Sequence, residues 1–279
     1  MALVHGHGFV TLGVPDLSSA VDFYTNTCRF VVTERRTTEV FLTGDERHHW
    51  LRLQERESPG LIRLGYKAVD AAAIGEVARR LERAGVPFTD GGLIGEDRVH
   101  GGIRFRDPSG IEIELYEEMV ELAQSPAPLE AGFMLLLHAV VHCADVAAGE
   151  AFYTQNLEFR RSDQIEDLAV FLRAENCYHH SLALMRSTSP GKLDHFAILL
   201  KDIDHVMRFQ AHATAQGVLE TGAVRHAASG SVSIYLRDES TDVGIEFCTS
   251  HMQIDDDSYR GRLLKADPAT ANVWSRTFS

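Results

Sequence analysis

The stretch Val21-Asp-Phe-Tyr-Thr-Asn-Thr-Cys-Arg-Phe30 returns later in the chain as Glu150-Ala-Phe-Tyr-Thr-Gln-Asn-Leu-Glu-Phe159. Each copy follows an apolar, strand-like run and an acidic residue, Asp16 or Asp145, that is placed to cap a helix. Apolar residues recur at helical spacing in the first copy and less regularly in the second. A repeat of this kind indicates that one structural unit occurs twice.

A second helical pattern recurs as well, because residues 70–85 parallel residues 202–217 and both end in Gly-Val. The glycine stands where a helix C-cap requires a positive φ. Each half then finishes with two strand-like runs, at 102–106 and 110–116 in the first half and at 232–236 and 243–247 in the second. The sequence therefore predicts, in each half, a strand, a helix and several strands, then the same order again.

The composition is that of an ordinary globular protein, with 44% hydrophobic and 24% charged residues. A length of 279 residues suits about two domains. We predict domains at residues 1–122 and 133–252, joined by a Pro/Ala linker at 123–132. A polar, irregular tail at 253–279 follows, and we expect it to cover the active site.

Charge and cysteine usage limit the partners. The net charge of -13 disfavours nucleic acids and anionic membranes. No apolar run approaches the roughly 18 residues of a membrane span, and the N-terminus lacks a signal-peptide pattern. Four cysteines are scattered along the chain, at Cys28, Cys143, Cys177 and Cys248. Their scatter suits a reducing cytoplasm. We expect a cytoplasmic homo-oligomer with a small-molecule partner.

Three residues form a candidate metal set. His138 and His195 lie in strand-like apolar runs, and Glu246 stands between two apolar residues of a third run. Two neutral imidazoles and one carboxylate can hold non-haem Fe(II) and leave coordination positions open. The alternatives are two core histidines and a salt-bridged glutamate, since a buried carboxylate is costly without a partner. Asp194 and His179 are expected to face away from the metal, because neighbouring strand residues point to opposite sides.

The first half serves as an internal comparison. The repeat aligns Phe9 with His138, Leu61 with His195 and Glu114 with Glu246. Because neither Phe nor Leu can coordinate a metal, we predict that only the C-terminal half binds one. His5 and His7 lie near the start of the chain and are expected to be solvated.

This repeat resembles the vicinal oxygen chelate (glyoxalase–bleomycin-resistance) superfamily, and its second half resembles the type I extradiol catechol dioxygenases. The resemblance implies an α+β fold of two domains, each made of paired βαβββ modules that form half-open barrels. It implies Fe(II), or alternatively Mn(II), held by His138, His195 and Glu246.

The resemblance also implies three catalytic residues that are not metal ligands. His180 stands fifteen residues before His195, and His226 stands nine before Tyr235, as in the dioxygenases. Tyr235 and Glu246 are eleven residues apart where about ten are expected, which we interpret as one inserted turn residue. Ser229 replaces an aspartate of some biphenyl-diol enzymes, so no role is transferred to it. By analogy, Val140, Leu172 and the tail around Trp274 are expected to line or cover the pocket.

The resulting hypothesis is an Fe(II)-dependent dioxygenase of aromatic catabolism that opens a catechol with O2, beside the diol, to a semialdehyde. His180 would act as the acid-base group, and His226 and Tyr235 would contact the diol. Two alternatives stay open. One is another metal-dependent enzyme of the superfamily, an isomerase or a glyoxalase-like lyase. The other is a protein that binds an aromatic compound without turnover. A monocyclic and a bicyclic diol fit equally well.

Overall fold

The computed structural model describes residues 2–256 and 258–275, without the side chain of Ile94. The N-terminal half comprises β1 (Val4–Val14), α1 (Leu17–Asp22), the π-helical turn η1 (Phe23–Thr27), β2 (Val31–Arg35), β3 (Glu39–Thr43), β4 (Leu51–Glu55), β5 (Gly60–Ala68), α2 (Ala71–Arg83), β6 (Phe88–Gly91), α3 (Ile94–Asp97), β7 (Val99–Arg106) and β8 (Glu112–Met119). These strands form one sheet in the order β2-β3-β4-β1-β5-β8-β7-β6.

The C-terminal half repeats this order. It comprises β9 (Phe133–Cys143), α4 (Val146–Leu157), β10 (Arg160–Ile165), β11 (Ala169–Arg173), β12 (Leu182–Arg186), β13 (Leu193–Leu200), α5 (Ile203–Gln216), β14 (Leu219–Arg225), β15 (Val232–Asp238) and β16 (Val243–Thr249). Its sheet has the order β14-β15-β16-β13-β9-β12-β11-β10-β17, in which the last strand, β17 (Arg262–Leu264), comes from the tail. Each half therefore contains two βαβββ modules, which confirms the predicted fold class.

The helices begin and end where the sequence indicates. Asp16 and Asp145 accept hydrogen bonds from the backbone N–H three residues on, at the starts of α1 and α4. Asp202 caps α5 in the same way, and Gly217 ends α5 with φ of 72°. Capping satisfies N–H groups that lack a partner within the helix. Local sequence thus fixes where each helix meets its sheet.

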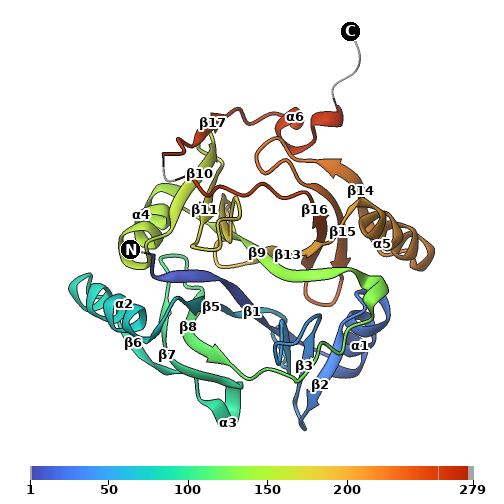
Figure 1. Cartoon of the computed structure of the whole chain (residues 1–279), viewed down its shortest axis with the longest axis horizontal. Helices are drawn as coiled ribbons and strands as arrows, with labels where there is room; N and C mark the ends of the chain where they lie inside the picture. Colours follow the sequence, from blue (N-terminus) through green and yellow to red (C-terminus); the bar gives the residue numbers. More distant parts are fainter. Residues whose placement is uncertain (1, 257, 276–279) are drawn as a thin grey trace.

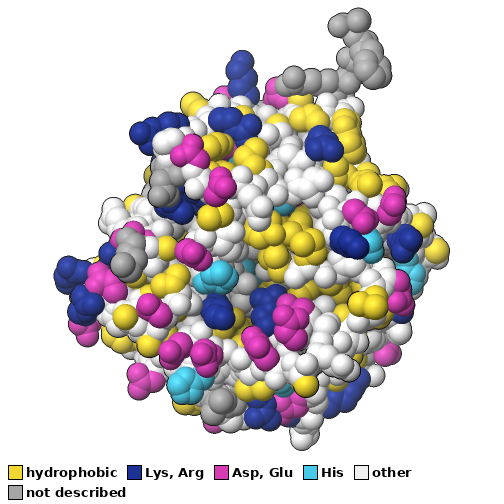
Figure 2. All heavy atoms as spheres, viewed as in Figure 1, with side chains coloured by type: hydrophobic (Ala, Val, Ile, Leu, Met, Phe, Trp, Pro, Cys, Tyr) yellow, Lys and Arg dark blue, Asp and Glu magenta, His cyan; other side chains and the backbone are white. Residues whose placement is uncertain are grey.

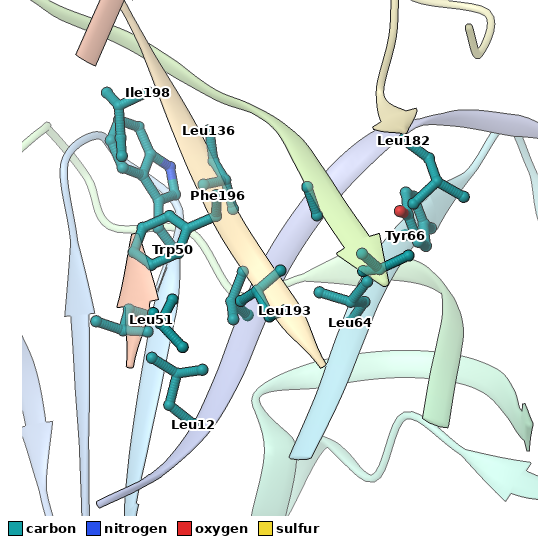
Figure 3. Close-up of a cluster of buried hydrophobic side chains, with 14 of the residues drawn as sticks. Leu12, Trp50, Leu51, Leu64, Tyr66, Leu136, Leu182, Leu193, Phe196 and Ile198 are labelled. Carbon is teal, nitrogen blue, oxygen red and sulfur yellow. The ribbon is translucent and has the colours of Figure 1, made fainter. Parts of the chain in front are cut away.

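The two curled sheets lie one above the other in Figure 1, with β1 and β9 crossing the middle of the molecule side by side. The helices lie on the outer faces. One hydrophobic core extends through both halves, and Figure 3 shows Leu12, Trp50 and Leu64 beside Leu136 and Phe196. Burial of this shared apolar surface holds the halves together.

Two predictions about the ends of the chain were wrong. His5 is half-exposed and pairs with Glu175 at 2.8 Å, as expected of a surface residue, but His7 is buried against Tyr66, with ring centroids 5.1 Å apart. Because β1 lies between the halves, its inward residues are covered. The tail is not wholly irregular, since it contains β17 (Arg262–Leu264), α6 (Pro268–Ala271) and the 3-10 turn η3 (Val273–Ser275).

The predicted linker lies between β8 and β9 and includes the 3-10 turn η2 (Leu129–Ala131). We propose 1–122 and 133–252 as the limits of the two domains. Among the described residues, every helix is too short or too polar to span a bilayer. On the face drawn in Figure 2, acidic and basic side chains are interspersed, so the net negative charge is not gathered into one patch there.

Candidate metal centre

Three neighbouring strands bring the candidate ligands together. On β13, Ala197 pairs with His138 of β9 on one side and with Glu246 of β16 on the other, while His195 lies two residues before Ala197. Because side chains two apart on a strand share a face, all three candidate ligands point the same way. Nε2 of His138 lies 3.0 Å and Nε2 of His195 lies 3.1 Å from Oε2 of Glu246.

This donor set fits a divalent metal. The three ligand atoms lie within 4.8 Å of one another, and Glu246 is almost fully buried. Burial alone would raise the pKa of Glu246, but His138 and His195 hold it well below its ordinary value. The site therefore presents an ionised carboxylate between two imidazole nitrogens, which suits Fe(II) or Mn(II).

Asp194 is a partner of the centre that sequence reasoning set aside. Its Oδ2 lies 2.6 Å from Nδ1 of His195, so the ring donates that N–H and directs Nε2 toward Glu246. Burial would lower the pKa of His195, but its bonds to Asp194 and Glu246 raise it to about 9. The prediction that Asp194 is not a ligand stays untested. Its contact is one that typically orients a metal-binding histidine.

A second group of imidazoles overlaps the first. His138, His180 and His251 also have ligand atoms within 4.8 Å of one another. Sequence reasoning missed His251, because it follows the last predicted strand and matches no family spacing. Three neutral imidazoles bring no negative charge to a divalent cation, whereas the set with Glu246 does. The charge balance therefore favours His138, His195 and Glu246.

The candidate ligands open into a cavity of about 240 Å³. The described residues that line it are His138, Val140, Ile165, Leu168, Ala169, Phe171, His180, Ala183, Met185, Asp194, His195, His226, Ala228, Ser229, Tyr235, Glu246, Thr270 and Ala271. Most of the wall is apolar, no lysine or arginine belongs to this lining, and α6 of the tail contributes its last two residues. Such a site suits an uncharged ring that carries a few polar groups.

The three predicted catalytic residues all line this cavity. The ring of His180 lies 4.0 Å from that of His138, centroid to centroid, and burial lowers its pKa well below the ordinary value. Tyr235 pairs with Glu246 across β15 and β16, so the extra turn residue does not displace it. The Tyr235 hydroxyl lies 2.8 Å from Nε2 of His226. Burial and the nearby Glu246 raise the pKa of Tyr235, so its phenol stays protonated.

Of the features expected at the pocket by analogy, Val140 lines it, and the tail lines it through Thr270 and Ala271. The prediction for Leu172 was wrong, because this residue lies in the hydrophobic core and its neighbour Phe171 faces the cavity. Trp274 is 52% exposed and stacks on Arg225 at 5.6 Å. The tail does reach the cavity, but through α6.

The N-terminal half shows what replaces the metal set. Thr11 of β1 pairs with Arg63, as Val140 of β9 pairs with His195, so Arg63 and not Leu61 is the equivalent of His195. Leu61 lies beyond a β-bulge in this pairing. The Arg63 guanidinium lies 2.8 Å from the fully buried Glu114. A fixed positive side chain thus neutralises the carboxylate that corresponds to Glu246.

Comparison with known proteins finds similar proteins over most of the chain. The family model described as the Glyoxalase/Bleomycin resistance protein/Dioxygenase superfamily matches residues 6–115 and 135–247. A biphenyl-2,3-diol 1,2-dioxygenase of Paraburkholderia xenovorans is 30% identical over 258 residues, which cover 86% of this chain and 85% of that protein. An iron-dependent extradiol dioxygenase of Rhodococcus jostii is 27% identical over 236 residues, 77% of each chain.

Among solved structures, a Mn(II)-bound glyoxalase from Novosphingobium aromaticivorans superposes with a TM-score of 0.90. The match covers 98% of this chain and 91% of that one, at 21% identity. At this identity the likeness bears on the fold alone.

Proposed function

This chain belongs to the glyoxalase/bleomycin resistance protein/dioxygenase superfamily, and from that membership we propose that it is an iron-dependent extradiol dioxygenase. It opens a catechol-type diol with O2, beside the hydroxyls, and both oxygen atoms enter the ring-opened semialdehyde. His138, His195 and Glu246 would hold Fe(II), or Mn(II) in its place. The bound metal would supply the electronic path between the diol and O2.

The observation that carries the assignment is the position of His180. Its ring lies against His138 and lines the cavity, yet it is outside the set that contains Glu246. A buried imidazole there can take up a proton from the substrate and, in that protonated form, stabilise negative charge that develops on oxygen and return the proton. A glyoxalase-like enzyme has no need of this group beside its metal.

His226 and Tyr235 form a second polar pair at the cavity. Because the Tyr235 phenol keeps its proton, it donates either to Nε2 of His226, 2.8 Å away, or to a diol oxygen. His226, at 4.0 Å from Glu246, can accept the proton that the diol loses as it binds. The pair would therefore orient the two hydroxyls and favour the monoanion of the diol.

The walls of the cavity specify an uncharged substrate. Val140, Ile165, Phe171 and Met185 offer apolar surface, and no described lining residue is a lysine or arginine that could pair with a substrate carboxylate. Burying an unpaired carboxylate is costly. We propose catechols with hydrogen or hydrocarbon substituents as substrates, either monocyclic or bicyclic.

The test is anaerobic reconstitution with Fe(II), followed by O2 uptake on a panel of diols. Catechol, 3-methylcatechol and biphenyl-2,3-diol should consume O2 and give coloured products, whereas dihydroxybenzoates should react poorly. Isomerase or glyoxalase-like chemistry would proceed without O2 uptake, and a binding protein would bind the diol with no product. The homo-oligomeric state and the cytoplasmic location stay predictions.

A further inference from the structure

The acid-base candidate His180 is connected, through its neighbour His179, to a buried carboxylate. His179 and His180 face each other through their Nδ1 atoms, 3.0 Å apart. The other nitrogen of His179, Nε2, lies 3.0 Å from Oδ2 of Asp163 on β10. Both His179 and Asp163 are fully buried. Hydrogen bonds therefore run without interruption from a carboxylate to the ring that lines the cavity.

The C-terminal tail holds this carboxylate. β17 pairs in parallel with β10, with Arg262 opposite Asp163. Oδ1 of Asp163 accepts from the Tyr259 hydroxyl at 3.1 Å and from the backbone N–H of Arg262 at 2.7 Å, and the Arg262 guanidinium bonds to Oδ2. Burial would raise the pKa of Asp163, but the bonds from His179 and Arg262 lower it to about 2. The carboxylate is thus ionised and fully hydrogen-bonded.

The charge of each group and the number of protons it can carry determine which atom donates in each of these hydrogen bonds. An ionised carboxylate only accepts, so His179 must donate from Nε2. Arg262 already balances the charge of Asp163, and a second positive charge on the fully buried His179 would be costly. A neutral His179 carries a lone pair on Nδ1 and accepts from Nδ1 of His180. The remaining nitrogen of His180, Nε2, then carries a lone pair and is available to the cavity, where it can take up a proton and later return it.

We propose that Asp163 and His179 are positioning residues for His180, which hold its ring and direct Nε2 to the substrate, and that the tail strand β17 holds Asp163 in place. This proposal rests on the proposed function, since it assigns a task to His180. The tail strand β17 would thus act on His180 through Asp163 and His179, separately from the part of α6 that lines the cavity.

The N-terminal half contains the same arrangement without the metal set. Nδ1 of His48 lies 3.3 Å from Nδ1 of His49, and Nε2 of His48 lies 3.2 Å from Glu34. Arg98 pairs with Glu34 as Arg262 pairs with Asp163. His49, however, packs against Phe9, the counterpart of the ligand His138. The repeat supplies a matched control, because any contribution of the carboxylate–histidine contact to folding stability is present in both halves.

The test uses Asp163→Asn. Donors face both oxygens of Asp163, so an amide satisfies one side only and in either orientation lacks the negative charge that keeps the proton of His179 on Nε2. The proton positions on both histidines are then no longer fixed. In the iron-loaded enzyme we expect kcat to fall on the order of 10²-fold or more, with KM and iron content near normal. The matched Glu34→Gln variant should keep the kcat of the natural protein.

A double variant separates positioning from structure. If Asp163 acts through His180, adding Asp163→Asn to His180→Gln should cause no further loss of kcat. Losses that multiply, or a kcat for Asp163→Asn within about threefold of normal, overturn the proposal. If Asp163→Asn fails to fold or loses iron, His179→Phe takes its place with the same expectations. No O2 uptake by the natural protein with any diol would reject the proposed function itself, which is a different result.

Discussion

Replacing Asp194 with asparagine should weaken iron binding without removing a ligand. In the natural protein, the Asp194 carboxylate accepts from Nδ1 of His195 at 2.6 Å and so directs Nε2 of that ring toward Glu246. An amide accepts more weakly than a carboxylate and can also turn its NH2 group toward the ring, where it repels the N–H. The orientation and basicity of His195 are therefore both reduced.

The expected loss of iron affinity follows from the typical contribution of such contacts in other metal sites. Loss of a residue that orients a metal-binding histidine typically costs about 10- to 100-fold in metal affinity, which corresponds to about 1.4–2.8 kcal/mol. The effect should lie within this range because Glu246 still faces both histidines. The assay is competition for Fe(II) with a chelator of known affinity, under anaerobic conditions, read as the iron Kd.

The chain offers a control of the same geometry. Asp202 lies 2.6 Å from Nδ1 of His205, away from the cavity, and its asparagine variant can still cap α5. Asp202→Asn should leave the iron Kd unchanged. If Asp194→Asn binds iron within twofold of the natural protein, or if both variants lose affinity equally, then Asp194 does not orient His195 and the reasoning fails.

Three further results are expected. Alanine at any of the three candidate ligands should remove most of the bound iron and the activity, while the circular dichroism spectrum stays near normal. The natural protein should hold one metal per chain. Two tightly bound metals per chain would mean that the repeat has been misread. His180→Gln should keep its iron and bind catechol in the absence of O2, but lose on the order of 10²-fold in turnover, with escape of hydrogen peroxide. His251→Leu should also keep its iron. A His251 variant that loses iron would favour the metal-binding group that lacks Glu246. Because the pKa of Asp163 is lowered to about 2, the stability it contributes is present above about pH 4 and is lost as the pH falls toward 2, so Asp163→Asn should flatten acid unfolding in that window.

Local signals made most of the fold predictable. The repeated Phe-Tyr stretches, the aspartate caps and the Gly-Val helix ends act within a few residues of their own position, so they can be read without knowing the tertiary structure. The candidate ligands were found because β-strand alternation and family spacing agree. The structure then brings His138, His195 and Glu246 within hydrogen-bonding distance across three strands.

The misses came from relations that local sequence does not contain. Leu172 was assigned to the pocket, but a one-residue error on a strand changes the face, and Phe171 is the residue that lines it. Arg63 is an exception, because the offset of 132 between the two second helices already aligns it with His195, and Leu61 was a counting error. The burial of His7 depends on how β1 packs between the halves. The contact of His179 with Asp163 joins the loop between β11 and β12 to β10, so only the fold could show it.

Extradiol cleavage is tested most directly by the product that the iron-loaded enzyme forms from catechol and isotopically labelled O2. We expect a coloured, ring-opened semialdehyde that carries both labelled oxygen atoms and is cleaved beside the diol. A colourless muconic diacid, cleaved between the hydroxyls, would contradict it. So would unchanged catechol with no O2 consumed by enzyme that has been shown to hold its iron.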